Sequence, residues 1–258
     1  IGIHDLDKVT PPIIYTAKKP ENIRFIPLGE NVEMNALEVL QKIEKGRTYG
    51  YIISSFEKWP VLLDAKGNVL SMPPIINSEL TRVTEETRNL FIDVTGTDEE
   101  MVRKTAVIIA CNLAERGATI ETVEVVKANL TEVHPCLEER YLDVSVKRVS
   151  RLLGIQVTPR YAVKLLRKMR LEAKQIDEDV VRVYIPPWRV DFLHEVDVAE
   201  EVAMAHGYNR VEPSLPDIMT IGEELKLNEV TNKVRDLMVG MGFQEVINYM
   251  LTNKETLF

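Results

Sequence analysis

The chain has 258 residues, of which 45% are hydrophobic and 28% charged, a composition that excludes a disordered or fibrous protein. Apolar runs such as residues 106–111 are far shorter than the roughly 18 residues of a membrane-spanning helix, so we expect no membrane association. With 40 acidic and 32 basic residues the net charge is −8, which argues against binding nucleic acid by bulk electrostatics alone.

Two cysteines, Cys111 and Cys136, are too few for a secreted disulfide framework, and no signal-peptide pattern is found at the start. We therefore expect a cytoplasmic protein. The sequence begins with Ile1 rather than Met and stops at Phe258 inside an unfinished polar-apolar pattern. This pattern predicts a fragment of a longer protein.

The first hundred residues mix helix and strand signals. An apolar stripe predicts one amphipathic helix over residues 33–46, with Gly46 as its C-terminal stop. Two strand-forming runs, 61–63 and 69–72, flank residues 64–68, whose Asp, Gly and Asn favour a hairpin turn.

The same mixture continues up to the middle of the chain. Residues 89–95 are typical of a strand, and Thr97 with Glu100 predicts a capping box that opens a helix. That helix is expected to end at Gly117, and alternation over 121–126 predicts another strand. The first half is therefore expected to be a mixed α/β domain.

The second half begins with a different pattern. Short helices are predicted over 145–153 and 159–170, the second opened by a Thr-Pro pair that suits a helix N-terminus. A hairpin follows, with strands over 171–176 and 180–185. Two helices and a hairpin predict a winged-helix-like unit, and residues 196–206 return to helix.

We predict a multidomain protein of the α+β or mixed α/β class. The expected parts are a first domain over residues 1–137, a winged-helix-like domain over 138–214, and a third part over 215–258. A proline-containing linker, residues 212–216, separates the second part from a last amphipathic helix. No internal repeat is expected.

Four carboxylates follow the second hairpin. Asp197, Glu200 and Glu201 lie at helical positions i, i+3 and i+4, and Asp191 immediately precedes that helix. Oxygen donors of this kind fit Mg²⁺, which prefers carboxylate and water ligands. The alternative is a solvated acidic face near a helix N-terminus, where negative charge is favourable.

A basic block covers the two short helices and contains no acidic residue. Its cations are Lys147, Arg148, Arg151, Arg160, Lys164, Arg167, Lys168 and Arg170. The block is compatible with contact to a phosphate backbone, but the acidity of the remaining chain favours docking on an acidic neighbour in a larger assembly.

A proline-rich segment over residues 72–82 leads into the polar run Asn77, Ser78 and Glu79. Its two prolines disfavour a helix and lack the backbone N–H groups that strand pairing requires. The segment is therefore expected to be an extended, shaped connection. The polar run is either an ordinary turn or part of a binding pocket.

Together, in this order, these features resemble the β subunit of archaeal and eukaryotic-type phenylalanine–tRNA ligases. In the first part the residues that carry the resemblance are the segments 2–7, 15–18, 69–77, 87–92 and 95–98. In the second part they are Pro-Pro-Trp-Arg-Val-Asp at 186–191 and the segment 197–209. The resemblance covers essentially the whole chain.

The resemblance implies an α2β2 enzyme that joins phenylalanine to tRNA(Phe) with ATP and Mg²⁺, the ligation being carried out by the α subunit. It implies that the first domain is an editing domain that hydrolyses tyrosyl-tRNA(Phe), and that residues 215–258 begin a class II catalytic-like module. Proofreading is needed because a hydrophobic pocket does not strongly reject an isostere that merely adds a hydroxyl.

The resemblance places the metal ligands on Asp191, Asp197, Glu200 and Glu201. Editing-pocket residues of bacterial relatives do not map onto this sequence, because the glycine-rich stretch that precedes their Ser-Glu-Val segment is here replaced by prolines and isoleucines. The candidates here are strand-end groups near the matching motif, with Asn77, Ser78 and Glu79 as catalytic and Leu70, Asp93 and Thr95 as substrate-binding residues. The rival hypothesis is a non-enzymatic nucleic-acid-binding or assembly module.

Overall fold

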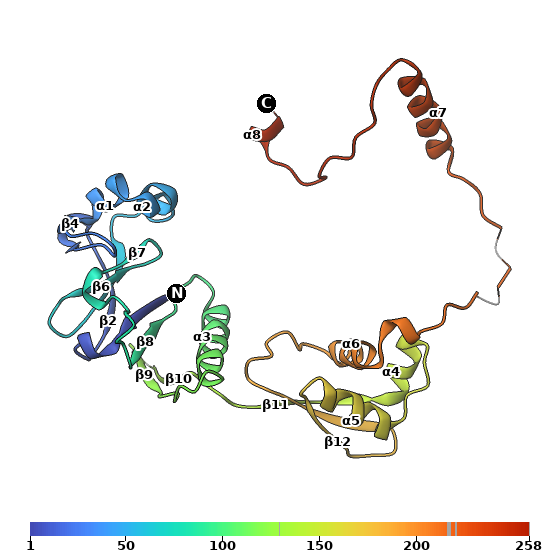
Figure 1. Ribbon diagram of the computed structural model, residues 1–258, viewed down its shortest axis with the longest axis horizontal. Helices are drawn as coiled ribbons and strands as arrows, with labels where there is room; N and C mark the ends of the chain where they lie inside the picture. Colours follow the sequence, from blue (N-terminus) through green and yellow to red (C-terminus); the bar gives the residue numbers. More distant parts are fainter. Residues whose placement is uncertain (129, 216–217, 220, 258) are drawn as a thin grey trace. The chain divides into compact units, whose positions relative to one another are not determined.

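The computed structural model describes residues 1–128, 130–215, 218–219 and 221–257 (Figure 1). Residue 216, the last of the expected linker, lies outside this described part. The chain divides into two compact units, Ile1–Val211 and Glu212–Phe258. Small antiparallel sheets alternate with helices, which confirms the predicted mixed α and β class.

The largest sheet has four antiparallel strands. In spatial order they are β2 (Ile14–Lys18), β5 (Trp59–Leu63), β6 (Val69–Met72) and β7 (Ile76–Asn77). The predicted hairpin between β5 and β6 is confirmed. Its turn uses Gly67 at a φ of 82°, and the buried Asp64 carboxylate accepts hydrogen bonds from Lys66 N and Asn68 N.

Two helices pack near this sheet, and here the predicted single helix over 33–46 is wrong. The structure has α1 (Ala36–Lys42) and α2 (Glu44–Tyr49), joined at Ile43, whose backbone is extended. Gly46 lies inside α2 and is buried rather than ending a helix. A Cβ atom on Gly46 would lie 2.1 Å from the carbonyl oxygen of Val39 in α1, so the glycine permits close packing of two helices.

Further short strands complete this part of the chain. β1 (Gly2–Asp5) pairs with β8 (Leu90–Asp93), and β3 (Arg24–Phe25) pairs with β4 (Met34–Asn35). One 3₁₀ turn, η4 (Glu79–Thr81), follows β7. These elements bring the predicted strand around residue 90 next to the first residues of the chain, a pairing that local sequence signals do not show.

The next helix, α3 (Glu99–Ala114), begins differently from the prediction. The predicted capping box between Thr97 and Glu100 is wrong, because Asp98 is the N-cap and its carboxylate accepts from Met101 N at 3.0 Å. Aspartate satisfies the same orphan N–H as a hydroxyl does. The strands β9 (Val123–Lys127) and β10 (Leu130–His134) follow as an antiparallel pair.

Glu99 joins α3 to this strand pair and should titrate unusually low. Hydrogen bonds from Lys127 and, second, Arg103 lower the pKa of Glu99 from 4.5 to about 2. A depressed folded-state pKa means that the stabilisation is complete above pH 4.5 and is lost as the pH falls through about 2. In a ¹³C NMR titration we expect the Glu99 midpoint near 2 and an upward shift in Lys127→Met. A wild-type midpoint at 4.5 would contradict the contact.

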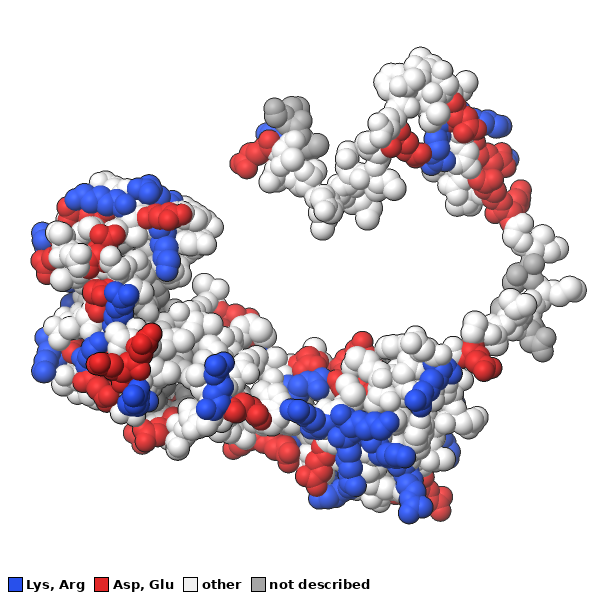
Figure 2. All heavy atoms as spheres, in the orientation of Figure 1, with Lys and Arg blue, Asp and Glu red and all other residues white. Residues whose placement is uncertain are grey.

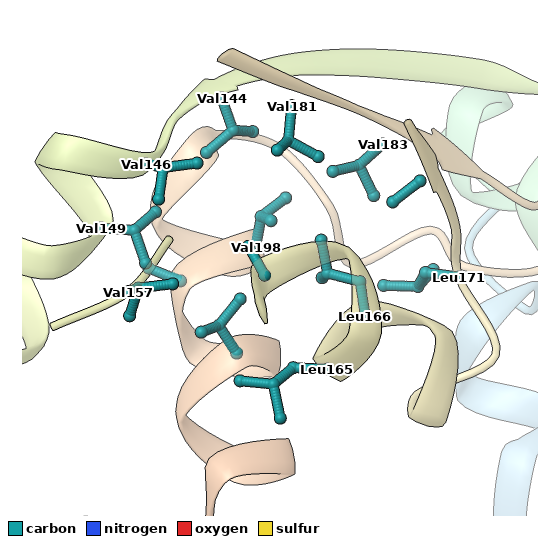
Figure 3. Close-up of a cluster of buried hydrophobic side chains, with 14 of the residues drawn as sticks. Val144, Val146, Val149, Val157, Leu165, Leu166, Leu171, Val181, Val183 and Val198 are labelled. Atoms are coloured by element: carbon teal, nitrogen blue, oxygen red, sulfur yellow. The ribbon is translucent and has the colours of Figure 1, made fainter. Parts of the chain in front are cut away.

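The second sheet has three antiparallel strands in the order β11 (Arg140–Ser145), β13 (Val180–Ile185), β12 (Glu172–Gln175). It packs with α4 (Val146–Leu153), α5 (Pro159–Lys168) and α6 (Glu195–His206). Figure 3 shows valines of β11 and β13 pointing at Leu165 and Leu166 of α5 and Val198 of α6. The predicted helices and hairpin are confirmed, whereas β11 was not predicted.

The unit after Val211 holds α7 (Lys226–Gly240) and α8 (Lys254–Leu257). The apolar face predicted for its longer helix is present but exposed, since Val230, Val234 and Leu237 all keep more than half of their surface accessible. In the described part of the chain, no helix has the length and hydrophobicity required to cross a bilayer.

Candidate functional site

The six candidate editing residues lie on consecutive elements of the first part of the chain. Leu70 of β6, Ser78 after β7 and Asp93 at the end of β8 are buried, with 0%, 3% and 9% of their surface exposed. The other three, Asn77, Glu79 and Thr95, are half-buried. The chain therefore places buried and accessible candidates in the same region, and their roles remain predictions.

The Ser78 side chain and backbone N–H are used in hydrogen bonds to the surrounding backbone. It is the N-cap of η4, where its hydroxyl accepts from Leu80 N at 3.3 Å and donates to the Ile26 carbonyl at 3.4 Å. Its backbone N–H also donates to the Leu70 carbonyl at 2.8 Å. Ser78 thus fixes the turn that carries Glu79, in addition to any contact with a substrate.

Glu79 is the most accessible acid of the candidate set, with 28% of its side chain exposed. Its Oε2 accepts from Gly29 N at 2.7 Å, and its Oε1 accepts from the Arg82 guanidinium at 3.1 Å. The Gly29 N–H and, second, Arg82 hold the pKa of Glu79 below its ordinary value. Glu79 is therefore anionic at neutral pH.

Two open depressions lie beside these residues. The larger, about 750 Å³, is lined by Lys8, Glu79 and the run from Arg82 to Glu85. The smaller, about 330 Å³, is lined by residues that include Val94, Thr95 and Met101. Both volumes lie in the ~300–1,000 Å³ range of ligand pockets. Glu79 therefore shares the larger depression with two cations, Lys8 and Arg82.

Asp93 is tied to two residues that sequence reasoning missed, His4 and Thr81. His4 Nε2 lies 2.9 Å from Asp93 Oδ2, and His4 Nδ1 lies 2.6 Å from Thr81 Oγ1. His4 belongs to one of the motifs that carry the family resemblance, but its partners are distant in sequence. Only the pairing of β1 with β8 reveals the contact.

The proposed metal ligands do not converge in this structure. Arg189 donates to both carboxylate oxygens of Asp191, at 3.0 and 2.8 Å, and also to Glu201 Oε1. The guanidinium lies over the Phe192 ring, 4.5 Å from its centroid. The hydrogen bonds that Arg189 donates to Asp191 and, less strongly, to Glu201 raise the pKa of Arg189, and Arg189 in turn lowers the pKa of Asp191. A protein cation therefore neutralises two of the four acids.

The other two acids have no hydrogen bond to Arg189. Asp197 Oδ2 accepts from the backbone N–H groups of Leu193 and His194, both at 2.7 Å, at the N-terminus of α6. These bonds, that of His194 first, lower the pKa of Asp197. Glu200 is exposed on the same helix. Asp197 therefore acts as a helix cap here.

One observation favours a cation and another opposes it. Glu201 Oε2 is buried and has no hydrogen-bond partner in the described chain, as an oxygen prepared for a ligand would be. However, among the described residues no group of three or more His, Cys, Asp or Glu is arranged to hold a metal ion. With Arg189 in place, the residues do not fit Mg²⁺, and the predicted site stays a prediction.

The cations of the basic block lie on α4, on α5 and just after α5, and Figure 2 shows a concentration of blue around α5. Within the described chain, Arg148 is the one member of the block with an ion pair, to Glu195 of α6 at 2.5 Å. The other cations therefore remain available to an anionic partner.

Three family comparisons cover nearly the whole chain. Residues 1–133 match the B3/4 domain, residues 142–208 the tRNA synthetase B5 domain, and residues 211–258 the phenylalanyl tRNA synthetase beta chain CLM domain. The matched ranges follow one another in the order expected from the resemblance.

Comparison with individual relatives gives the same result. The chain is 49% identical over 259 residues to the phenylalanine–tRNA ligase beta subunit of Methanocaldococcus jannaschii, covering 100% of this chain and 47% of that protein. It is 42% identical to the corresponding subunit of Methanosphaera stadtmanae, covering 98% of this chain and 46% of that protein. The chain thus spans about half the length of these relatives.

A solved structure also matches. It is the crystal structure of an N-terminal fragment of the phenylalanyl-tRNA synthetase beta subunit from Pyrococcus horikoshii, with a TM-score of 0.77 and 41% identity. The match covers 80% of this chain and 59% of that one. Identity of this level over the full chain, with three consecutive domain matches, means that the chain belongs to the family of phenylalanine–tRNA ligase beta subunits.

Proposed function

We propose that this chain is the proofreading and structural part of a phenylalanine–tRNA ligase, and that its first domain hydrolyses tyrosyl-tRNA(Phe). The observation that carries the proposal is the anionic carboxylate of Glu79 at an open depression shared with Lys8 and Arg82. Family membership supports the same conclusion. It does not favour the alternative, a non-enzymatic nucleic-acid-binding or assembly module.

The chemistry required of this site is modest. Water adds to the ester carbonyl, the bond to the ribose oxygen of the tRNA breaks, and tyrosine and the free ribose hydroxyl leave. Glu79 accepts a hydrogen bond from the attacking water or from the substrate ammonium. Lys8 and Arg82 face the negatively charged 3′ end of the tRNA. Because the ester is already activated, positioning and polar stabilisation are sufficient.

The domain assignment belongs to the same proposal. We assign residues 1–137 to the editing domain, 138–214 to a winged-helix-like domain, and 215–258 to the linker and the start of a class II catalytic-like module. The helices α4 and α5 followed by the β12–β13 hairpin support the second assignment. The B3/4, B5 and CLM matches support the order of the three.

The complete enzyme is proposed to be a cytoplasmic α2β2 assembly. Its α subunit would perform the ATP-dependent ligation of phenylalanine to tRNA(Phe), with Mg²⁺ as cofactor. Asp191, Asp197, Glu200 and Glu201 remain the predicted Mg²⁺ ligands of this chain. Since Arg189 binds two of them, the cluster has to rearrange before it could hold a divalent cation, and no chemical step is assigned to it.

Removing Glu79 is the test of the editing site. We expect Glu79→Ala in the assembled enzyme to slow hydrolysis of tyrosyl-tRNA(Phe) by about 10²-fold, the usual contribution of a positioned acid or base. Ser78→Ala should slow it less, because Ser78 acts through the turn it caps. The reaction is measured as release of labelled tyrosine.

Glu85→Ala is the matched control. Glu85 lines the same depression, and we propose no catalytic role for its carboxylate. Phenylalanine ligation, measured in parallel, should stay unchanged in all variants. Equal hydrolysis by wild type, Glu79→Ala and Ser78→Ala would place the reaction elsewhere. A wild-type enzyme that binds tRNA(Phe) but leaves the ester intact would favour the non-enzymatic alternative.

A further inference from the structure

A fully buried histidine lies beneath the candidate editing residues. The ring of His4 has 0% of its surface exposed, and it bridges Thr81 of η4 and Asp93 of β8. Thr81 is 1% exposed and Asp93 is 9% exposed. Thr81 and Asp93 follow His4 by 77 and 89 positions in the sequence, and the three side chains form a continuous hydroxyl–imidazole–carboxylate network.

The direction of these hydrogen bonds follows from the chemistry of the three groups. An ionised carboxylate only accepts, so His4 Nε2 has to donate to Asp93 Oδ2. A neutral imidazole then accepts at Nδ1, and the Thr81 hydroxyl donates to it. The Asp93 carboxylate thus selects the tautomer of His4 that carries its N–H on Nε2, and the Thr81 hydroxyl supports this tautomer by donating to Nδ1.

This arrangement resembles a nucleophilic triad in composition but not in accessibility. The Thr81 hydroxyl is buried, so no ester carbonyl reaches it. The least buried of the three groups is the carboxylate of Asp93, whose side chain keeps 8% of its surface exposed. Its Oδ2 is held by His4, while its Oδ1 has no hydrogen-bond partner among the residues described. One oxygen is fixed and the other is left free to accept.

The surroundings of Asp93 preserve this orientation. Gly2 is paired with Asp93 across the β1–β8 ladder, and a Cβ atom on Gly2 would lie 1.9 Å from Asp93 Oδ2. The glycine therefore leaves the space that the carboxylate fills. Burial and, second, the Asp93 charge raise the pKa of the Tyr15 phenol, so a phenolic group already lies within the electrostatic reach of this carboxylate.

The geometry points to His4 and Thr81 as positioning residues that hold Asp93 so that its free oxygen accepts the phenolic hydroxyl of a tyrosyl ester. This inference rests on the proposed editing function and deepens it, because it adds two positioning residues to the substrate-binding candidate Asp93. An acceptor distinguishes the tyrosyl hydroxyl from the bare phenylalanyl ring only if its orientation is fixed, because a mobile carboxylate can rotate to form hydrogen bonds with water instead. The hydrogen bonds of His4 to Asp93 and to Thr81 fix the orientation of the Asp93 carboxylate.

The experiment measures kcat and KM for hydrolysis of tyrosyl-tRNA(Phe) and phenylalanyl-tRNA(Phe) by the assembled enzyme. Loss of a hydrogen bond to a charged acceptor is worth about a tenfold change or more, so His4→Leu should reduce the preference for the tyrosyl ester by at least roughly tenfold. His4→Gln, which keeps an N–H near the Nε2 position, should restore much of it. Asp93→Asn gives the loss expected when the acceptor itself is altered.

Thr81 provides the second, milder pair of variants. Thr81→Val keeps the shape but removes the hydroxyl, and it should lower the same preference by a smaller factor than His4→Leu. Thr81→Ser keeps the hydroxyl and should resemble wild type. A purely structural role would lower hydrolysis of both esters together and leave their ratio unchanged. If His4→Leu does not assemble, the Thr81 pair decides the question.

The outcomes separate this inference from the proposed function. A wild-type enzyme that hydrolyses neither ester overturns both. The positioning role is overturned, with editing left intact, if His4→Leu keeps the wild-type preference for the tyrosyl ester while Asp93→Asn loses it. If His4→Leu does not assemble, Thr81→Val takes its place in this comparison. A retained preference in Asp93→Asn as well moves hydroxyl recognition to another residue and also overturns the positioning role.

Discussion

Arg189→Met is expected to lower the free energy of unfolding of the β11–β13 sheet and its helices by about 3 kcal/mol, the lower end of the range for breaking a buried ion pair. The reason is Glu201, whose side chain is 5% exposed and whose one bound oxygen depends on Arg189. Removing the guanidinium leaves a buried carboxylate without any partner. The lower end applies because Arg189 itself is 26% exposed.

Peptide-resolved hydrogen exchange of α6 measures this effect without assuming that the whole chain unfolds in one step. The double variant Arg189→Met, Glu201→Leu should regain most of the loss, because no unpaired charge remains. Arg182→Met is the matched control: Arg182 pairs with Asp143 on the exposed face of β13, and such surface pairs contribute at most about 1 kcal/mol. Equal losses in Arg189→Met and Arg182→Met would contradict the argument.

The Arg189→Met variant also tests the metal prediction. If the four carboxylates can form a site once the guanidinium is gone, Mg²⁺ should raise the stability of the variant in a concentration-dependent way. Asp197→Asn in the same background should abolish that response. No response to Mg²⁺ in Arg189→Met would mean that the four acids bind no metal ion. Asp197 would then be a helix cap, Asp191 and Glu201 ion-pair partners of Arg189, and Glu200 a solvated side chain.

Gly46→Ala is expected to cost about 3 kcal/mol or more, above the usual cost of an extra methyl group in a packed core. The new Cβ atom would meet the Val39 carbonyl oxygen at 2.1 Å and Leu40 Cα at 2.7 Å. Both are backbone atoms of α1, so relief requires the two helices to separate. That separation also disturbs Val39, which is buried in the core beside the four-stranded sheet.

Gly50→Ala is the matched comparison, because it is the same substitution one turn later. The three atoms nearest to its Cβ atom would all belong to the Leu40 side chain, the closest at 2.8 Å, and a side chain can change rotamer. We expect a clearly smaller loss. Urea unfolding followed by the fluorescence of Trp59, in a Trp188→Phe background, reports on this core, where Trp59 is 3% exposed. Losses of equal size would show that helix–helix contact is not the cause.

Local signals predicted the β12–β13 hairpin and the helices packed against it, but not strand β11. Thr158 caps α5 through Tyr161 N, and Pro159 follows at the first position of the helix. Gly154 ends α4 in the left-handed conformation, at a φ of 68°. Each of these interactions spans only a few residues, so the chain's own sequence contains both partners. Element type follows from such contacts before any tertiary packing is considered.

The sequence by itself determined the family, the mixed α and β class and the residues worth testing, because motifs and periodicity are written along the chain. Only the tertiary structure decided what those residues contact. It placed Arg189 between Asp191 and Glu201 and put His4 against Asp93, 89 positions away. It also turned Gly46 from an expected helix end into a helix contact. The physical reason is that charge neutralisation, hydrogen-bond direction and close packing depend on distances through space, which spacing along the chain does not specify.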